Sequence, residues 1–301
     1  MTEADIIARI AAVTPRGAER LGIGDDGAIL ADGLVVTTDS MVEGIHWDAR
    51  LDPADVGWKL VAVNISDLGA MGARPAWATL ALALPRRADG TADGRWLDAF
   101  AAGLGEACRH WSLPIVGGDT TASPGPRVLT LTAGGHAPRP VLRSGGRAGD
   151  CLAVTGALGR AAEAFFSSAP SPEAVSWFRR PEPPLALALA LAESGHLHAM
   201  MDLSDGLGID VAHLAIASGC GADITSAAVP GGGSLPDRLA FGEDYELLLA
   251  FPPEVLDAVG CLAAMHGKPL HVIGALTDDP AIRLDGRPEW PAPRFTHFPS
   301  T

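Results

Sequence analysis

Five short acidic segments are the part of this sequence best suited to chemistry. They are Gly24-Asp25-Asp26, Thr37-Thr38-Asp39, Asn64-Ile65-Ser66-Asp67, Gly117-Gly118-Asp119-Thr120 and Asp202-Leu203-Ser204-Asp205. Each places a carboxylate beside small or hydroxyl residues, usually where a strand or a helix is expected to end. Mg²⁺ prefers hard oxygen ligands, and no His/Cys metal cluster accompanies these segments. The five segments together suggest oxygen ligands gathered around Mg²⁺ and phosphates.

Asp67 is the most informative single position. It falls in an expected helix over residues 52–71, three residues after Asn64, so the two side chains share one face. A carboxylate on a largely apolar helix is costly unless it is paired or coordinates a cation. A salt bridge to Lys59 or Arg74, or an exposed polar stripe, is an equally good interpretation of this residue alone.

The other segments also have plain structural interpretations. Asp25-Asp26 between glycines is typical of a turn, and Asp39 after a buried strand could cap a helix or form an Asx-turn. Either Asp202 or Asp205 could cap the helix that follows, but capping does not explain both. Glycines after a strand, as at Gly117-Gly118, expose backbone N–H groups that can meet phosphate oxygens.

The segments carry more weight together than singly. Two unit charges about 4 Å apart repel by roughly 4 kcal/mol at an effective dielectric constant near 20. The repulsion among several buried carboxylates without cations would therefore exceed the usual free energy of unfolding of about 5–15 kcal/mol. The acidic residues are thus either scattered over the surface or gathered around divalent metal, and spacing alone does not decide between these.

Composition and charge narrow the classes of function. The 301 residues are 48% hydrophobic and carry a net charge of −14, which disfavours binding to nucleic acid or to anionic membranes. The four cysteines are widely spaced, and the first residues lack the features of a secretion signal. The longest apolar run, residues 185–192, is far shorter than a membrane span. We expect a soluble, cytoplasmic protein.

Strands and helices alternate along the whole chain, which predicts an α/β or α+β architecture. Expected helices cover residues 52–71, 96–110, 158–166, 185–193, 207–218 and 254–266, after a short opening helix around residues 6–10. Expected strands cover residues 34–38, 77–84, 114–116, 128–132, 151–155, 200–203, 247–251 and 272–276. The glycine-rich basic junction Arg143–Arg147 is the expected boundary, so we divide the chain into residues 1–140 and 141–301.

Familiar nucleotide and hydrolase motifs are missing from the sequence. It has no GxxxxGK[ST] loop, no GxGxxG after a strand, no kinase HRD or DFG element and no GxSxG elbow. Among the nine histidines, His46 in Gly44-Ile45-His46-Trp47 is the best candidate for a polar contact.

In this order, the segments resemble the thiamine-monophosphate kinase family, within the superfamily of aminoimidazole-ribonucleotide synthetase. The matching segments are residues 22–26, 37–47, 59–72, 117–121, Arg143-Ser144-Gly145, 202–207 and Gly242-Glu243-Asp244-Tyr245-Glu246-Leu247. The resemblance spans nearly the whole chain. It differs at Phe241, where the family usually has a first glycine, and at Trp47, where the family commonly has phenylalanine.

The resemblance implies a fold, a reaction and a set of residues. It implies two α/β domains with mixed sheets covered by helices, a homodimer formed largely by N-terminal domains, and ATP-dependent phosphorylation of thiamine monophosphate to thiamine diphosphate. The N-terminal domain would bind ATP and magnesium, and the C-terminal domain would complete the site. The residues implied for several Mg²⁺ ions are Asp26, Thr37, Thr38, Asp39, Asp67, Asp119, Asp202 and Asp205. Those implied for ATP are Gly118, Asp119, Arg143 and Ser204, and those for thiamine monophosphate are His46, Glu243 and Phe295.

This chemistry suits the residues, because phosphoryl transfer needs alignment and charge neutralisation more than covalent help. Asp119, Arg143 and Asp205 are the expected catalytic residues. Arg143 would add a positive charge, and Phe295 or Trp47 could stack on a ring.

Other functions remain open from the sequence. A selenophosphate synthetase-like or hydrogenase-maturation-like enzyme is disfavoured because the cysteines that those families use are not found in the expected places. A nucleotide-binding homologue without turnover is disfavoured because all the expected metal carboxylates are present.

Overall fold

The structure, a computed structural model, describes residues 1–15 and 17–297. Its α-helices are α1 (Glu3–Val13), α2 (Pro53–Ala70), α3 (Gly94–His110), α4 (Arg160–Phe166), α5 (Pro172–Arg179), α6 (Leu185–Ser194), α7 (Leu207–Ala217), α8 (Leu235–Ala240) and α9 (Leu256–Met265). Its strands are β1 (Ala28–Ile29), β2 (Leu34–Val42), β3 (Arg74–Pro85), β4 (Ile115–Ser123), β5 (Val128–His136), β6 (Cys151–Thr155), β7 (Ala199–Asp202), β8 (Gly221–Ile224), β9 (Leu247–Phe251), β10 (Leu270–Thr277) and β11 (Ile282–Leu284). Short 3-10 turns cover Ser226–Ala228 and Pro253–Val255.

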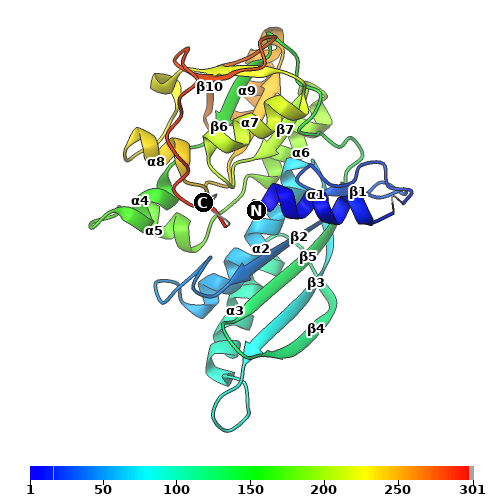
Figure 1. Ribbon diagram of the computed structural model, residues 1–301, viewed down its shortest axis with the longest axis vertical. Helices are drawn as coiled ribbons and strands as arrows, with labels where there is room; N and C mark the ends of the chain where they lie inside the picture. Colours follow the sequence, from blue (N-terminus) through cyan, green and yellow to red (C-terminus); the bar gives the residue numbers. More distant parts are fainter. Residues whose placement is uncertain (16, 298–301) are drawn as a thin grey trace.

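The first half of the chain forms a mixed 5-stranded sheet in the order β1-β2-β5-β3-β4. Helix α2 packs on β2 and β5, and α3 packs on α2, so the helices cover one face (Figure 1). Leu129, Leu131 and Ala133 of β5 are fully buried beneath them. The opposite face carries hydroxyl pairs, such as Ser40 Oγ and Thr130 Oγ1 at 2.6 Å, and remains open.

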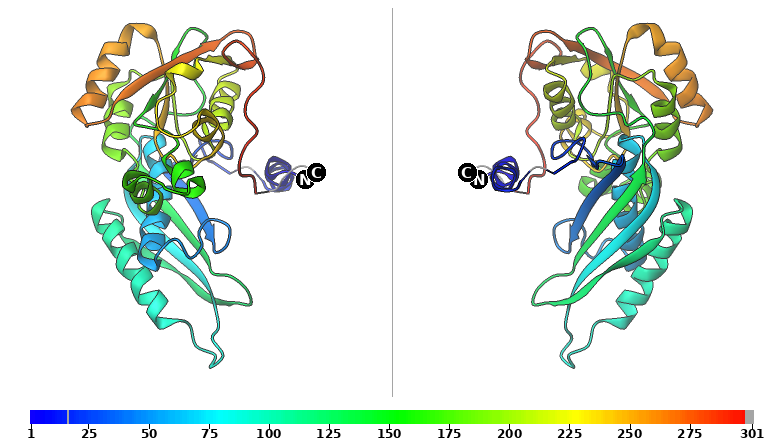
Figure 2. Two further views of the ribbon diagram at one scale, coloured as in Figure 1. Left: turned by 90° about the vertical axis from the view of Figure 1, so that its left-hand side faces the viewer. Right: turned by 90° about the vertical axis from the view of Figure 1, so that its right-hand side faces the viewer.

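The second half forms a mixed 6-stranded sheet in the order β11-β8-β10-β6-β9-β7. Strand β9 lies between β6 and β7 and is buried along its whole length, which explains its unbroken apolar sequence. Helices α6 and α7 lie beside this sheet, and α1 projects from the side of the molecule (Figures 1 and 2).

Helix α2 joins the two halves. Besides its own sheet it contacts α6 and β7 of the second half. It begins at Pro53, directly after Asp52, although the Asp52 side chain makes no capping hydrogen bond. It ends before Gly72, which has a φ of 65° and whose added Cβ would lie 2.5 Å from that of Ala192. Only glycine permits this turn so close to α6.

The expected α/β class is confirmed, and most expected elements appear close to their predicted bounds. The predicted division at residue 140 stays a prediction, although the two sheets fall on either side of it. Helices α5 and α8 and strands β1, β8 and β11 were not predicted, and all of them are short. The sequence analysis was wrong about β4, which continues through Gly117-Gly118-Asp119 to Ser123 because these residues pair in parallel with β3.

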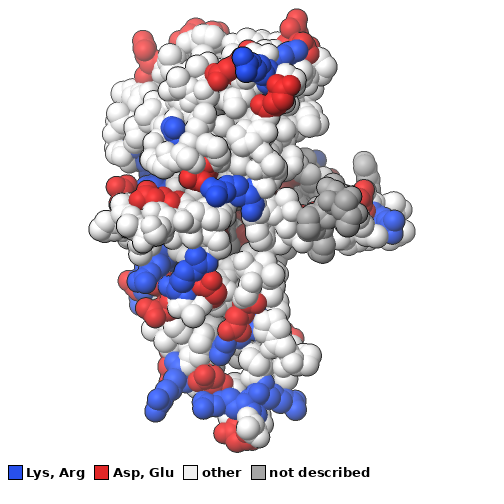
Figure 3. Space-filling view, turned by 60° about the vertical axis from the view of Figure 1, so that its left-hand side comes forward, with Lys and Arg blue, Asp and Glu red and all other residues white. Residues whose placement is uncertain are grey.

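Among the described residues, no helix has the length and apolar character needed to cross a bilayer. On the face shown in Figure 3, acidic and basic side chains are intermixed rather than gathered into one basic surface.

The contact between α2 and α3 leads to a prediction about Gly103. A Cβ at this position would lie 1.8 Å from the backbone oxygen of Ala54, so the two helices would have to separate. We expect Gly103→Ala to destabilise the protein by about 1–3 kcal/mol, the usual effect of overpacking. Gly105→Ala is the matched control on the same helix, because only the flexible end of Arg109 lies within 4 Å there. Urea unfolding would measure both, and equal stability of the two variants would contradict this account of the packing.

Candidate active site

Three carboxylates from distant parts of the chain form the centre of the site, which we call the acidic group. Asp26 lies in the loop before β1, Asp67 lies on α2, and Asp202 ends β7. One carboxylate oxygen of each lies within 4.8 Å of the others. Asp26 and Asp202 are 6% and 1% exposed. Carboxylates from three of the five acidic segments therefore meet where the two halves of the chain join.

Asp67 faces the sheet because of its place on α2. The hydroxyl of Thr37 on β2 donates a hydrogen bond to its Oδ2. Asn64, one turn earlier on the same face, donates from Nδ2 to the backbone oxygen of Leu60 at 3.0 Å. Its own Oδ1 is buried without a hydrogen-bond partner. The face of α2 that Asn64 and Asp67 were predicted to share is therefore the face that carries Asp67 into contact with Asp26 and Asp202.

The salt-bridge interpretation of Asp67 is wrong, because both candidate cations are engaged elsewhere. Lys59 pairs with Glu243 at 2.8 Å. Arg74 lies 3.6 Å from Glu193 on the surface. Asp67 thus lies among other carboxylates, close to Asp26 and Asp202, and its role as a cation ligand stays a prediction.

Asp39 lies inside β2 rather than after it, because β2 stays in register with β5 as far as Val42. The alternation of side chains places Thr37 and Asp39 on the face covered by α2 and Thr38 on the open face. Accordingly, Thr38 Oγ1 lies 2.9 Å from Thr132 Oγ1 across the strand pair. Burial and the neighbouring charge of Asp202 raise the pKa of Asp39 to about 6.

The electrostatics of the acidic group favour a divalent cation. Burial raises the pKa of Asp26 and of Asp67 well above the ordinary aspartate value, and repulsion from neighbouring carboxylates adds to this. Unit charges 4.8 Å apart repel by roughly 3–4 kcal/mol at an effective dielectric constant near 20. Asp26 Oδ2 is also buried without a hydrogen-bond partner. Buried carboxylate oxygens, one of which lacks a hydrogen-bond partner, are ligands that fit Mg²⁺.

Arg143 supplies positive charge beside this group. Its Nε lies 3.1 Å from Asp26 Oδ1, and a second guanidinium nitrogen contacts the same oxygen. Its backbone N–H donates to Asp25 Oδ2 at 3.1 Å, and its carbonyl accepts from Ser218 Oγ at 3.0 Å. Asp25, Asp26 and Arg143 therefore connect the first half of the chain to the junction before β6.

Two serines hold Asp202 in place. Ser66 on α2 donates to Asp202 Oδ2 at 2.6 Å, and Ser204 donates to Oδ1 at 3.2 Å. The sequence analysis quoted Ser66 but gave it no role. The available signal was a hydroxyl directly before Asp67 on a largely apolar helix.

Asp205 belongs to a second group, with Asp210 and His213 of α7. One donor atom from each lies within 4.8 Å of the others, and Asp205 and His213 are exposed. Asp210 is fully buried, and its Oδ2 accepts from the backbone N–H of Gly206 at 3.1 Å. The sequence analysis missed Asp210 and His213, whose spacing of three residues on one helix was the available signal.

Gly118 and Asp119 lie apart from the acidic group within one chain. Asp119 is in register with Ala81, Thr130 and Ser40, so it lies three strands from β2, roughly 14 Å at about 4.8 Å per strand. It also lies on the open face of the sheet, whereas Asp39 lies on the face covered by α2. Both residues of β4 are exposed.

The residues predicted for thiamine monophosphate come together near the end of the described chain. The rings of His46 and His297 are 5.1 Å apart, and those of Phe295 and His297 are 4.9 Å apart. Burial lowers the pKa of His46, and the charges of His297, Glu243 and Lys59 also act on it. No role at thiamine monophosphate was predicted for His297 or for Lys59, which was considered only as a partner of Asp67.

The two departures from the family pattern are explained by packing. Trp47 is 6% exposed in the core of the first half, so the suggestion that it stacks on a substrate ring is wrong. Phe241 packs against the rings of Phe165 and Phe166, at 5.6 and 5.2 Å. At Gly242, an added Cβ would lie 1.9 Å from the backbone oxygen of Ser204. Of the two glycines usual in the family, this chain therefore keeps the one that the contact with Ser204 requires.

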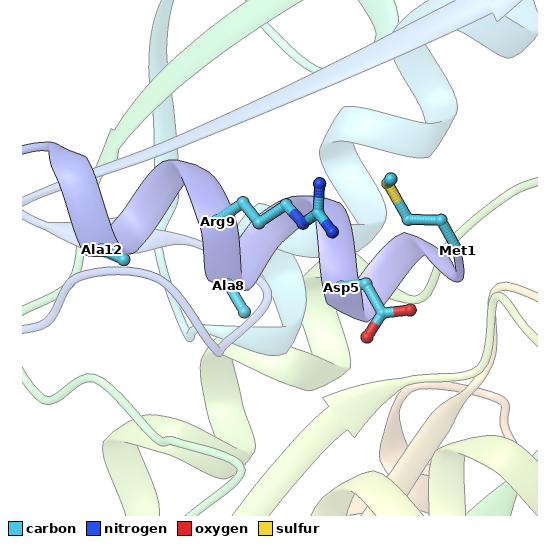
Figure 4. Close-up of a pocket in the computed structure, with 5 residues that line it drawn as sticks. All are labelled: Met1, Asp5, Ala8, Arg9 and Ala12. Carbon is cyan, nitrogen blue, oxygen red and sulfur yellow. The ribbon is translucent and has the colours of Figure 1, made fainter.

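A separate hollow lies along α1 and is lined by Met1, Asp5, Ala8, Arg9 and Ala12 (Figure 4). Its residues are Met1 and four residues of α1, and the Asp5 carboxylate already accepts a hydrogen bond from the N–H of Thr2, the N-cap of this helix, at 2.8 Å. The hollow contains none of the residues of the acidic group.

Comparisons with known proteins show the family of the chain. The family model described as AIR synthase related protein, N-terminal domain, matches residues 24–137, and the corresponding C-terminal domain model matches residues 147–287. Thiamine-monophosphate kinase of Escherichia coli is 37% identical over 284 residues, which cover 86% of this chain and 85% of the relative. The enzyme of the same name from Haemophilus influenzae is 32% identical and covers 89% and 88%.

Solved structures show the same relationship. AaThiL complexed with AMPPCP and TMP superimposes with a TM-score of 0.86 at 28% identity, covering 99% of this chain and 97% of that one. Thiamine-monophosphate kinase from Stenotrophomonas maltophilia gives a TM-score of 0.77 at 33% identity, covering 96% and 98%. Escherichia coli HypE, a hydrogenase maturation protein, gives 0.71 at 21% identity over 95% and 90%, which shows a shared fold alone. The chain belongs to the thiamine-monophosphate kinase family, within the proteins related to AIR synthase.

Proposed function

We propose that this protein transfers the γ-phosphoryl group of ATP directly to thiamine monophosphate, giving thiamine diphosphate and ADP. The observation that carries the proposal is the meeting of Asp26, Asp67 and Asp202 within 4.8 Å, in a chain that belongs to this family. A similar protein is described as complexed with an ATP analogue and TMP. Both reactants are anions, so the site must above all allow negative charges to approach one another.

Several Mg²⁺ ions are the proposed metals. Asp26, Asp67 and Asp202 would hold them at the centre, with Asp39 and the hydroxyl of Thr37 beside them. Thr38 would contribute through its backbone, because its side chain faces away. Bound Mg²⁺ neutralises phosphate charge and aligns the reacting groups. Asp205, which lies in the second group with Asp210 and His213, would be a further Mg²⁺ ligand.

The protein residues have distinct proposed roles around the two substrates. Arg143 would exchange part of its contact with Asp26 for the ATP phosphates, and Ser204 would lie beside them. Glu243 would face the cationic part of thiamine monophosphate, with His46 and Phe295 flanking it. The attacking phosphate oxygen is already anionic near neutral pH, so direct in-line transfer needs no strong general base.

A homodimer is proposed from the exposed edge of the first sheet. Strand β4 is the edge strand, and its Ile115 and Val116 are 37% and 66% exposed. Such an edge invites pairing with another chain. A dimer built on this sheet would cover β4 and bring Gly118 and Asp119 of one subunit towards the acidic group of the other. We also propose a cytoplasmic location, where ATP and Mg²⁺ are abundant.

The direct test is an assay of the purified protein with ATP, Mg²⁺ and thiamine monophosphate. We expect thiamine diphosphate and ADP in equal amounts, detected by chromatography. Thiamine without its phosphate is the control acceptor and should give no product. Absence of thiamine diphosphate across a range of Mg²⁺ concentrations would falsify the proposed reaction.

Asp119→Asn tests the role of β4. We expect turnover to fall by roughly 10²–10³-fold, because Asp119 is a proposed Mg²⁺ ligand and its loss weakens the hold on a cation that neutralises the transferring phosphate. The melting temperature should stay unchanged, since the Asp119 side chain is exposed and makes no hydrogen bond or ion pair with the residues that the structure describes. Asp93→Asn, at the start of α3, is the control for an acidic residue outside the site. Turnover like that of the wild type would remove Asp119 from the site.

Asp67→Asn tests whether the acidic group binds metal. Without Mg²⁺, we expect the variant to be more stable than the wild type by about 1–3 kcal/mol, because repulsion within the group is relieved. Adding Mg²⁺ should raise the melting temperature of the wild type much more than that of the variant. Calorimetry with and without EDTA measures both effects. Equal Mg²⁺-induced shifts in the two proteins would show that Asp67 is not a metal ligand.

A further inference from the structure

Lys59 is a buried cation whose presence the stability of the fold does not explain. It lies on α2 and is 1% exposed. Its Nζ lies 2.8 Å from both Oε1 and Oε2 of Glu243. Replacing a buried ion pair by apolar residues of similar volume is often neutral or stabilising. A lysine at this core position therefore calls for a role other than holding the helix in place.

The segment that carries Glu243 is already fixed through its backbone. Glu243 and Tyr245 have φ values of 66° and 48°, in the left-handed region that non-glycine residues rarely adopt. The N–H of Glu243 donates to the carbonyl of Ser204 at 3.0 Å, and that of Tyr245 donates to the carbonyl of Leu203 at 2.8 Å. Such a conformation persists only where the surroundings determine it. These bonds fix the backbone, but they leave the Glu243 side chain free to turn.

Lys59 supplies the missing constraint on that side chain. By contacting both carboxylate oxygens, it fixes the plane of the carboxylate as well as its position. The Lys59 ammonium lies 4.5 Å from the centre of the Phe178 ring, which limits its own movement. The Glu243 side chain is 23% exposed, compared with 1% for Lys59. The carboxylate is therefore the part of the pair that reaches the substrate side, and Lys59 acts through it.

We propose that Lys59 is a positioning residue that orients the Glu243 carboxylate towards the cationic part of thiamine monophosphate. The inference rests on the proposed function, in which Glu243 faces this substrate. It also connects the two halves of the site, because the helix that carries Lys59 carries Asp67 two turns later. Lys59 thereby sets the position of the substrate group relative to the metal-binding carboxylates.

Lys59→Met tests this proposal, since methionine has a similar length without charge. We expect the Kd for thiamine monophosphate, measured by isothermal titration calorimetry, to rise at least about tenfold, because the unpaired carboxylate loses its orientation. The Kd for ATP with Mg²⁺ should change less than about twofold. Lys59→Arg keeps the charge and should recover part of the affinity that Lys59→Met loses.

Lys268→Met is the matched control. Lys268 Nζ lies 2.8 Å from Oε1 of Glu246, in the same segment, but Arg160 contacts that oxygen too, at 2.7 Å. Glu246 therefore stays paired when Lys268 is replaced, and we expect thiamine monophosphate to bind within about twofold of the wild-type affinity.

Each outcome decides a separate question. A Lys59→Met protein that binds thiamine monophosphate like the wild type overturns the inference alone. Equal losses for thiamine monophosphate and ATP, or better binding by Lys59→Met than by Lys59→Arg, would assign Lys59 to the packing of α2 and also overturn it. If Lys59→Met fails to fold, Lys59→Arg is compared with Lys268→Met instead. A Kd of Lys59→Arg for thiamine monophosphate within twofold of the wild-type value supports the orienting charge. A tenfold loss of affinity for both substrates overturns it. A wild-type protein that binds no thiamine monophosphate contradicts the proposed function itself.

Discussion

Repulsion between carboxylates brought together from both halves of the chain is the constraint on which the rest of this structure depends. Asp26, Asp67 and Asp202 lie within 4.8 Å of one another, and two of them are almost completely buried. A fold stabilised by a small net free energy tolerates such a group only where cations or hydrogen bonds offset the repulsion. Arg143 and the serine hydroxyls offset part of it. The remaining repulsion is the observation on which the proposed Mg²⁺ site rests.

Helix α2 connects the acidic group to the other parts of the site. It presents Asp67 to the acidic group, Ser66 to Asp202 of the second sheet, and Lys59 to Glu243. Its other contacts, among them the bond from Trp58 Nε1 to the carbonyl of Pro181 at 2.9 Å, hold it against the second half. A single helix thus sets the distance between the carboxylates proposed for Mg²⁺ and the residues proposed for thiamine monophosphate.

Sequence patterns predicted what depends on local order along the chain. The periodicity of α2 placed Asn64 and Asp67 on one face, and the structure turns that face towards the acidic group. Patterns could not predict which partner each charge finds across the chain, so the pairing of Lys59 with Glu243 was missed. They also could not show that Gly117–Asp119 continue a strand, because that depends on pairing with β3. The placement of Asp119 away from Asp39 follows from this register and not from any local signal.

A crystal of the protein grown with Mn²⁺ in place of Mg²⁺ and a non-hydrolysable ATP analogue tests the central claim most directly. Anomalous scattering locates Mn²⁺ without reference to the protein coordinates. The account predicts Mn²⁺ peaks between the carboxylates of Asp26, Asp67 and Asp202, bridging to the nucleotide phosphates. Bound nucleotide with no Mn²⁺ at these three residues, or Mn²⁺ held only by surface carboxylates elsewhere, would contradict it.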